Sequence, residues 1–368
     1  IELLRENRLA HPGFDPTLPR QAVFLTTGRL VGGAAPAAQD YCQRLVERAD
    51  IALEIWDRER LIELMQGAVS TGLADRTEGP LLGIIAAVDD RIVTDHLLEQ
   101  FSQRWCREQQ EAWPCVLEAA VVASRLQKAG RADLACYVGL ALVRAGCWHI
   151  LGSQPPNAEW NTAADLGRRV FATYADFLWR RATDGGPDAA DMLAAHREPA
   201  ALITHAVRCV RLVEIVGLLG LMSPVEGYEQ PSAAELAAWT SGFIRRQRSA
   251  ASPISDRWAV AVIPPALLLA KQGFCERSAD YLRDLVLWIA QRYGTGVGLA
   301  DAMATPDDEV RQVIGNVVPP SNVMRRTESY LGSVILDLTA FLKLDRLYSL
   351  ARNESHVVGA SPPVVTTE

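Results

Sequence analysis

The stretch RQAVFLTTGRLVGGAAPAAQDY, residues 20–41, is unlike the rest of the chain and decides the fold of its N-terminal part. Residues 22–27, AVFLTT, form a short apolar run that ends before Gly28, and such a run predicts a buried strand. Pro36 then stands in the first turn of an amphipathic stretch with large or apolar side chains every four residues from 41 to 49. That spacing and a proline in the first turn are typical of a helix.

A second strand and a second helix follow the first pair. Residues 51–56, IALEIW, predict another strand, and Asp57 is a suitable N-cap for a helix over 58–66, RERLIELMQ. The connection between the two strands is long enough for a right-handed crossover, which makes neighbouring strands parallel. Residues 1–66 therefore predict a small α/β piece in the order β-α-β-α, with parallel strands.

The composition changes after this piece. Residues 67–80, GAVSTGLADRTEGP, are rich in Gly, Ser and Thr and predict a linker. Residues 81–354 predict a large α-helical domain of antiparallel helix pairs, and the tail at 355–368 is expected to be disordered. Helical stretches are expected near 81–110, 113–129, 131–147, 159–183, 188–222, 232–249, 255–272, 274–293, 306–315 and 324–352. The predicted fold class is mainly α, with the small N-terminal α/β piece.

Two helix pairs within this domain resemble each other. They are EAAVVASRLQKAGRADLACYVGLALVRAG, residues 118–146, and PPALLLAKQGFCERSADYLRDLVLWIAQRYG, residues 264–294. Each has an apolar helix, a basic residue close to a glycine, and a second helix after a short turn. This is the pattern of an αα-hairpin repeat of the tetratricopeptide type, although the consensus Trp, Gly and Tyr positions are missing. One hypothesis is therefore a non-enzymatic scaffold that binds a protein or peptide partner, or a second copy of itself.

Residues 8–66 resemble the C-terminal half of a restriction-endonuclease-like domain of the Mrr type, in the PD-(D/E)XK nuclease superfamily. The segments LPRQAVFLTTGRL, APAAQDY and IALEIWDRERLIELM carry the resemblance. In that family a late strand ends in a Thr-Thr-Gly or Thr-Asn-Gly turn, a helix follows, and a further strand and helix close the domain. The resemblance implies a bacterial DNA endonuclease that uses Mg²⁺ and acts in defence against foreign DNA or in DNA metabolism. The helical domain would then sense a signal, bind a partner or oligomerise.

The catalytic motif of that family is not found in this chain. The resemblance implies an Asp, Glu or Gln two residues before a lysine, to hold metal and position water. At that position stand Leu126, Leu269 and Phe341, ahead of Lys128, Lys271 and Lys343. We therefore assign no catalytic and no metal-binding residue and expect no cofactor in this chain, with Mg²⁺ implied only for the full nuclease domain. We expect the catalytic half to lie upstream of Ile1, so that this chain is a fragment; the alternative is degeneration into a non-catalytic module.

Arginines and threonines supply the candidates for contact with nucleic acid. Those in the N-terminal part flank the first strand or stand in its turn, and the others form the basic patch FIRRQRSAAS, residues 243–252. The candidate nucleic-acid-binding residues are Arg20, Thr26, Thr27, Arg29, Arg245, Arg246 and Arg248. The alternative is that these residues bind no nucleic acid. Exposed arginines are often only solvated, and basic residues at a helix C-terminus complement the helix dipole.

Composition limits the remaining possibilities. The net charge is −7, so any DNA contact must use local basic patches. The seven cysteines form no CxxC pair, which favours buried thiols in a reducing cytoplasm. The longest apolar run, residues 258–270, is 13 residues long and contains two prolines, so we expect no contact with a membrane and a cytoplasmic location. The excess of arginine over lysine and the many alanines indicate a GC-rich bacterial source.

Overall fold

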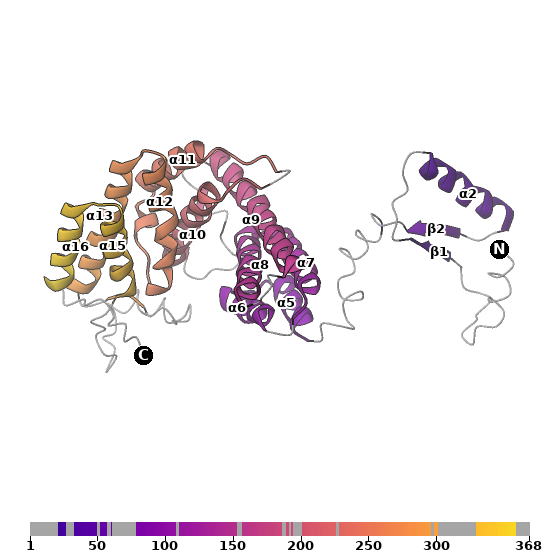
Figure 1. Cartoon of the computed structure of the whole chain (residues 1–368), viewed down its shortest axis with the longest axis horizontal. Helices are drawn as coiled ribbons and strands as arrows, with labels where there is room; N and C mark the ends of the chain where they lie inside the picture. Colours follow the sequence, from indigo (N-terminus) through magenta and orange to yellow (C-terminus); the bar gives the residue numbers. More distant parts are fainter. Residues whose placement is uncertain are drawn as a thin grey trace. The chain divides into compact units, whose positions relative to one another are not determined.

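The computed structural model is mainly helical, with one small sheet of two strands (Figure 1). It describes residues 21–26, 33–49, 52–56, 60, 79–107, 110–152, 157–185, 189–190, 193, 201–225, 228–295, 298–300 and 329–357. The chain divides into two units, Ile1–Glu78 and Gly79–Glu368. The fold class predicted from the sequence is therefore confirmed. Apart from its last two residues, the expected linker at 67–80 lies outside the described residues. The tail at 355–368 was expected to be disordered, but its first three residues, 355–357, are helical because the last helix continues through them; the remainder lies outside the described residues.

The N-terminal unit consists of strand β1 (Gln21–Leu25), helix α2 (Ala34–Ala49) and strand β2 (Ala52–Trp56). The two strands pair in parallel, with a register that runs from Gln21 opposite Ala52 to Leu25 opposite Trp56. The predicted strand, helix and parallel strand are thus confirmed. The helix expected over 58–66 lies outside the described residues except for Arg60.

Strand β1 is exposed, so the prediction that it would be buried is wrong. Val23 is 38% exposed and Phe24 is 59% exposed. Consecutive strand residues point to opposite faces of a sheet, so both faces of this one are open. The physical reason is the size of the sheet: in the described part of this unit, two five-residue strands and one helix offer too little surface to cover an apolar strand on both sides.

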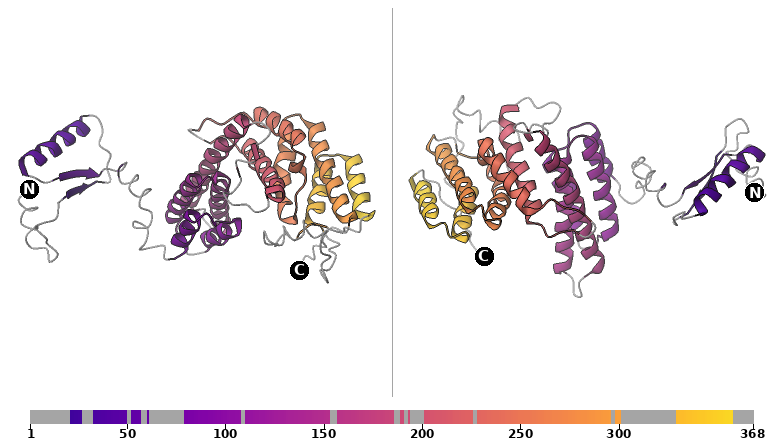
Figure 2. Two further views of the ribbon diagram at one scale, coloured as in Figure 1. Left: turned by 180° about the vertical axis from the view of Figure 1, so that it is seen from behind. Right: turned by 90° about the horizontal axis from the view of Figure 1, so that it is seen from above.

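The helical unit is a succession of helices that follow one another along an arc (Figures 1 and 2). Its α-helices are α5 (Pro80–Asp89), α6 (Asp95–Gln103), α7 (Ala112–Lys128), α8 (Ala132–Gly152), α9 (Ala158–Asp184), α10 (Ala201–Leu221), α11 (Ala233–Arg246), α12 (Ile263–Lys271), α13 (Cys275–Gly294), α15 (Tyr330–Phe341) and α16 (Asp345–Val357). Short 3-10 turns lie between some of them: η1 (Arg104–Cys106), η3 (Arg248–Ala251), η4 (Asp256–Trp258) and η5 (Val260–Val262).

Three of the predicted helices are broken where a single helix was expected. The stretch 81–110 is divided because Thr94 caps a new helix, its side chain accepting a hydrogen bond from the amide of Leu97. The stretch 255–272 is divided into the 3-10 turns η4 and η5 and an α-helix that begins only at Ile263, since Pro264 and Pro265 are tolerated in a first turn but not further inside a helix. The stretch 324–352 is divided at Lys343. The predicted helix at 306–315 lies outside the described residues.

Four helix pairs, α5–α6, α7–α8, α12–α13 and α15–α16, are joined by the same turn. One residue in each turn has positive φ: Arg91 at 60°, Gly130 at 80°, Gly273 at 84° and Lys343 at 55°. The amide of the next residue bonds the carbonyl five residues back, as when Arg131 donates to Leu126 over 2.8 Å and Phe274 donates to Leu269 over 2.8 Å. This is a Schellman motif, which ends a helix and reverses the chain. The repeated hairpin seen in the sequence thus has a common structural basis.

Helices α8 and α9 pack backbone against backbone. A Cβ atom on Gly139 would lie 2.6 Å from the backbone nitrogen of Phe171, and one on Gly167 would lie 2.9 Å from the carbonyl oxygen of Gly139. Only glycine leaves room for such an approach. This contact fixes the axis of α8 and thereby the positions of Tyr137 and Arg144.

By length and composition, α8 is the one helix in the described parts of the chain that could cross a membrane. It differs from the longest apolar run of the sequence, which lies over 258–270. In the structure α8 packs against α7 on one side and α9 on another, as the interior helix of a helical array does.

Helix α10 runs through the centre of the unit. Its apolar side chains, among them Leu212, Ile215 and Val216, are fully buried. It approaches α12 closely at Gly217, where a Cβ would lie 2.7 Å from the nitrogen of Pro265. Two ionisable residues, Arg211 and Glu214, interrupt this apolar helix three residues apart and therefore lie on one face.

Candidate functional site

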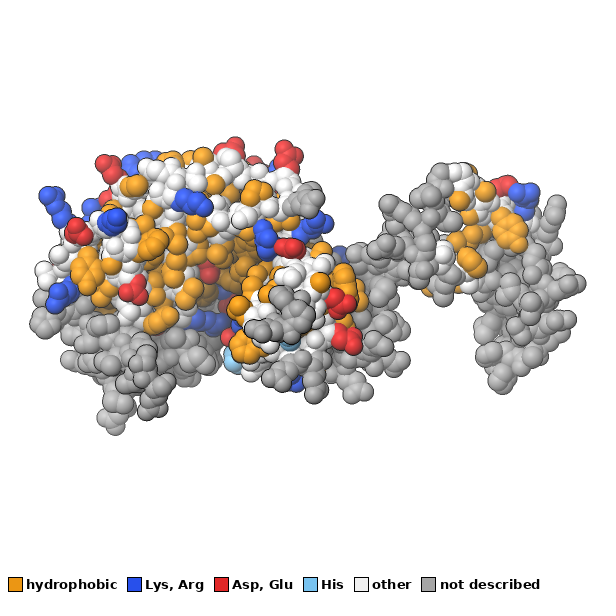
Figure 3. Space-filling model, viewed as in Figure 1, with side chains coloured by type: hydrophobic (Ala, Val, Ile, Leu, Met, Phe, Trp, Pro, Cys, Tyr) orange, Lys and Arg blue, Asp and Glu red, His pale blue; other side chains and the backbone are white. Residues whose placement is uncertain are grey.

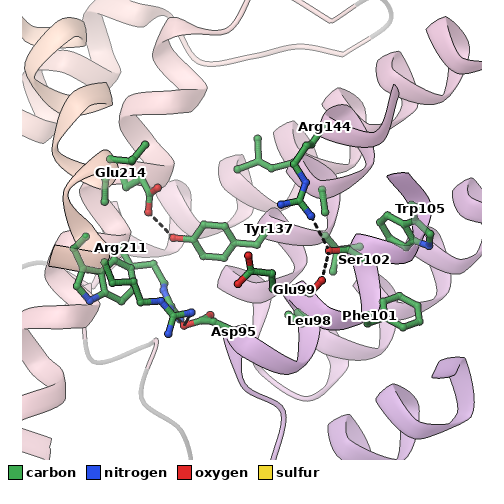
Figure 4. A pocket seen from close by; sticks show the side chains of 17 residues that line it. Asp95, Leu98, Glu99, Phe101, Ser102, Trp105, Tyr137, Arg144, Arg211 and Glu214 are labelled. Carbon is green, nitrogen blue, oxygen red and sulfur yellow. Dashed lines mark hydrogen bonds and ion pairs between the residues drawn. The ribbon is translucent and has the colours of Figure 1, made fainter. Parts of the chain in front are cut away.

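A cavity of about 300 Å³ lies in the helical unit, between α6, α8, α10 and the turns η1, η4 and η5. Ligand pockets in proteins usually measure about 300–1,000 Å³, so the cavity is large enough for a small ligand or a side chain of a partner. Figure 3 shows hydrophobic side chains in the hollow of this unit, with acidic and basic side chains near them. Figure 4 shows side chains from α6, α8 and α10 converging on the cavity.

Apolar and aromatic side chains form one part of the wall. Leu98 and Phe101 come from α6, Trp105 from η1, and Val138 and Ala141 from α8. The ring of Phe101 meets that of Trp105 edge to face, with their centroids 5.4 Å apart. Such a wall favours a flat apolar group on the ligand.

Contacts with Glu118 and His149 hold Trp105 in place. It is fully buried, and its Nε1 donates to Glu118 Oε2 over 2.8 Å. Burial raises the pKa of Glu118, against the opposing effects of this hydrogen bond and of Arg104, with which it forms an ion pair. A ring nitrogen of His149 lies 2.8 Å from the carbonyl oxygen of Trp105, and the His149 ring stacks on Trp160. The histidine thus belongs to the support of the wall.

A buried ion-pair network forms the opposite part of the wall. Arg211 Nη1 lies 2.7 Å from Asp133 Oδ2, and Nη2 is paired with Asp95. Arg131 holds the same Asp133 carboxylate through two hydrogen bonds of 3.1 and 3.0 Å. Burial alone would raise the pKa of Asp133, but the charges of Arg131 and Arg211 outweigh it and lower this pKa. Likewise, the carboxylates of Asp95 and Asp133 raise the pKa of Arg211 although burial would lower it.

Tyr137 and Glu214 lie between the aromatic part of the wall and the ion-pair network. The Tyr137 hydroxyl donates to Glu214 Oε2 over 2.5 Å, and the Arg211 guanidinium lies 5.3 Å from the Tyr137 ring centroid. Burial raises the pKa of Glu214 to about 7, although the hydrogen bond from Tyr137 and the charge of Arg211 act in the other direction. A carboxyl group in a cleft that titrates near neutral pH is typical of functional sites.

Three buried polar atoms of the wall have no hydrogen-bond partner within the described residues: Asp95 Oδ1, Arg211 Nε and Trp258 Nε1. Trp258 and Arg211 are each only 6% exposed. A buried polar atom without a partner costs about 1–3 kcal/mol, so these atoms are rare in a protein interior unless water or a ligand satisfies them. Other such atoms lie elsewhere in the described residues, for example Arg125 Nε and Thr240 Oγ1, but three on one cavity wall mark this cavity as the candidate site.

Of the residues singled out in the sequence for nucleic-acid contact, those that the structure describes lie away from the cavity. Thr26 belongs to the N-terminal unit, where its amide donates to the carbonyl of Trp56 over 3.0 Å. Arg20, Thr27 and Arg29 lie outside the described residues. Arg245, Arg246 and Arg248 are brought together at the end of α11 and in η3, where Arg245 and Arg246 are exposed. These two stand in the last helical turn, where positive charge complements the helix dipole. None of the four that the structure describes lines the cavity.

The cavity was not predicted from the sequence, although one signal was available. Arg211 and Glu214 stand in the apolar run 210–222. From the sequence they are predicted only to belong to the helix expected over 188–222. Charged residues inside such a run need partners, and here the partners are Asp133, Asp95 and Tyr137.

In the parts of the chain that the structure describes, no group of three or more His, Cys, Asp or Glu side chains is placed to hold a metal ion. The described cysteines form no disulfide; Cys115, Cys136 and Cys209 are buried, whereas Cys147 and Cys275 are exposed, so the prediction of buried thiols is wrong for these two. Comparisons with protein-family models, with curated proteins and with solved structures found no match for this chain.

Proposed function

We propose that the helical unit is a recognition module, and that it binds a ligand or a side chain of a partner in the cavity between α6, α8 and α10. The observation that carries this proposal is the set of three buried polar atoms on one cavity wall, at Asp95, Arg211 and Trp258, that have no partner among the described residues. A bound group that satisfied them would contribute the free energy of those hydrogen bonds to binding.

The surrounding architecture supports recognition in preference to chemistry. Stacked αα-hairpins with a concave side are a common framework for binding partners. Among the described residues, those that line the cavity include no histidine and no cysteine. The nucleophile-and-base pairs of hydrolases that use these side chains therefore do not form on this part of the wall.

A variant that fills the cavity tests the proposal. Ala141 lines the cavity, and Ala141→Trp places an indole in it. Cys147→Trp, at an exposed position of the same helix, is the matched control. The full chain is screened against small molecules and short peptides by the shift in unfolding temperature, since a ligand that binds the folded state stabilises it. We expect hits that stabilise the wild type and the control variant but not Ala141→Trp. If every hit stabilises all three proteins equally, the cavity is not the site.

The N-terminal unit favours a second candidate function. Its strand, helix and parallel strand are in the order that the Mrr-type resemblance implies, which supports the hypothesis that this unit is part of a DNA endonuclease used in defence, in the bacterial cytoplasm. In this case the helical unit would act as its sensing or partner-binding domain. The described residues offer no donor set that fits Mg²⁺, so this second candidate function includes no metal-dependent step within them.

Binding to duplex DNA by the full chain tests this second candidate. The arginines at the end of α11 and the start of η3 form a local basic patch, so the triple variant Arg245→Gln, Arg246→Gln, Arg248→Gln is expected to weaken binding and to reduce its dependence on salt. Arg277→Gln, Arg283→Gln in α13 is the control for charge alone. Binding that is equally weak for all three proteins and independent of salt would argue against a DNA role for these residues.

A further inference from the structure

We propose that the cavity takes an oxyanion joined to a flat apolar group, that is, an aromatic carboxylate or an aromatic phosphate monoester. This inference rests on the proposed function, namely that the cavity is a ligand site. The chemical class of the ligand follows from the side chains that line the cavity.

Two guanidinium groups of the wall are only weakly engaged. Arg144 Nη2 makes a long hydrogen bond of 3.4 Å to Ser102 Oγ, and Arg257 Nη2 lies 3.8 Å from Asp95 Oδ2. Asp95 is already paired with Arg211. Figure 4 shows Arg144, from α8, reaching toward the cavity from the side opposite Arg211. Guanidinium groups with spare N–H donors bind planar carboxylates and phosphates in preference to neutral groups.

A neutral donor stands beside one of these cations. Trp258 follows Arg257 directly in η4, it is buried, and its Nε1 has no hydrogen-bond partner in the described part of the chain. The Arg257 guanidinium lies 6.0 Å from the centroid of the Trp258 ring. The indole N–H and the guanidinium form a donor corner that an oxyanion satisfies, whereas Asp95 Oδ1 on the same wall is an acceptor that an oxyanion leaves without a partner.

Hydrogen bonds to the start of helix α15 fix the position of η4. Asp256, the residue before Arg257, is buried and accepts hydrogen bonds from the amides of Tyr330 and Leu331 over 3.1 and 3.0 Å. It thereby caps the N-terminus of α15. The donor corner is therefore held in place before any ligand binds, which lowers the entropic cost of binding.

The charged groups that line the cavity are three arginines, Arg144, Arg211 and Arg257, and three carboxyl groups, Asp95, Glu99 and Glu214. Arg211 is already paired with Asp95 and with Asp133. Arg144 and Arg257 make only the long contacts described above. The Glu214 carboxyl accepts the hydroxyl proton of Tyr137 in a hydrogen bond. An added carboxylate or phosphate would pair with the two arginines in a partly buried site, where such pairs are screened less than at the surface.

The apolar part of the ligand is set by the aromatic wall. Phe101, Trp105 and Leu98 lie along one side of the cavity and Val138 and Ala141 along another. A cavity of about 300 Å³ accommodates a fused pair of six-membered rings. Aromatic rings pack edge to face or offset against such a wall.

Calorimetric titration of the full chain tests this inference. The probes are 2-naphthoate, 2-naphthyl phosphate and the neutral 2-naphthamide, which share one ring system and so isolate the effect of the anionic group. We expect both anions to bind at least about tenfold more tightly than the amide. The ratio between the two anions then distinguishes a carboxylate site from a phosphate site.

Matched variants assign the effect to the two arginines. Arg144→Gln and Arg257→Gln each remove one charge and keep a polar side chain, and Arg283→Gln in α13 is the control. We expect each of the first two to weaken binding of the anions about tenfold and to leave the amide unchanged. Circular dichroism of each variant shows that it is folded, so that lost binding is not lost structure.

Two outcomes would overturn the inference. If the amide binds as tightly as the anions, or if neither arginine variant weakens the anions, the site does not select an oxyanion. The proposed function would still stand if Ala141→Trp removed binding of the amide or of any other hit. It would fail together with the inference if Ala141→Trp affected no ligand at all.

Discussion

Arg211 Nη1 lies 2.7 Å from Asp133 Oδ2, and this buried ion pair joins α10 to the first turn of α8. The two residues are 78 positions apart in the chain. Arg131 binds the same carboxylate from the turn that precedes α8. The wall of the candidate site therefore also joins the α7–α8 hairpin to α10.

Removing the charge of Asp133 should destabilise the fold. Asp133→Asn leaves the buried Arg211 and its neighbour Arg131 with one carboxylate fewer, and breaking a buried pair costs about 3–5 kcal/mol. We expect a loss near the lower end of this range, since Asp95 still pairs with Arg211. Urea denaturation measures the free energy of unfolding. Asp280→Asn, at an exposed pair, should change it by less than about 0.5 kcal/mol.

The close approach of α8 and α9 predicts a second effect. Gly139→Ala would put a methyl group 2.6 Å from a backbone atom of α9, and such overpacking costs about 1–3 kcal/mol. Gly83→Ala in α5 is the control, because nothing lies within 4 Å of a Cβ there. Alanine favours a helix over glycine, so we expect Gly83→Ala to be neutral or stabilising. Equal effects of the two substitutions on the midpoint of thermal unfolding would contradict the packing of α8 on α9.

The repeated Schellman turn predicts opposite effects at two of its members. Lys343 has a φ of 55°, which costs energy for any residue but glycine. Lys343→Gly should therefore stabilise the protein by up to about 1 kcal/mol. Gly273 has a φ of 84°, so Gly273→Ala should destabilise it by about 1 kcal/mol or more. Chemical denaturation measures both, and two changes of the same sign would mean that the turns are not alike.

Glu214 makes the stability of the protein depend on pH. Its pKa in the folded protein is about 7, raised from 4.5 by burial, so the fold favours the protonated form. This contribution to stability is fully present below about pH 4.5 and is lost as the pH rises through about 7. Glu214→Gln keeps the acceptor for Tyr137 and removes the ionisation. We expect the variant to exceed the wild type in stability by roughly 1–3 kcal/mol at about pH 8, and not at about pH 4. A difference that is constant over this range would show that Glu214 does not titrate near neutral pH.

Much of the fold could be predicted from the sequence, because local patterns determine it. The apolar run before Gly28, the long connection and the run at 51–56 were sufficient to predict two parallel strands. The glycines at 130 and 273 marked the ends of helices, as their positive φ requires. The breaks at Arg91 and Lys343 were not predicted. Residues other than glycine rarely adopt a positive φ, and an arginine or a lysine in the sequence does not indicate one.

The candidate site could not be predicted in the same way. Asp95, Tyr137, Arg211 and Trp258 come from four separate elements, and their spacing along the chain carries no motif. Their proximity depends on how α6, α8, α10 and η4 pack. The basic residues near the end of α11 form a recognisable patch because they are adjacent in the sequence. The arginines of the cavity, Arg144, Arg211 and Arg257, are far apart in the sequence and form no such patch.

The indole N–H resonances of the protein test the central claim most directly. The full chain, labelled with ¹⁵N-tryptophan and assigned by Trp→Phe substitution, is titrated with the ligand that most raises the unfolding temperature. We expect the resonance of Trp258 to move, because a ligand in the cavity would give its N–H a partner, and that of Trp105 to move with it. Trp288, whose N–H donates to the carbonyl of Pro253 over 2.7 Å, and the exposed Trp148 should not move. A shift of Trp288 or Trp148 with no change at Trp258 would contradict the account.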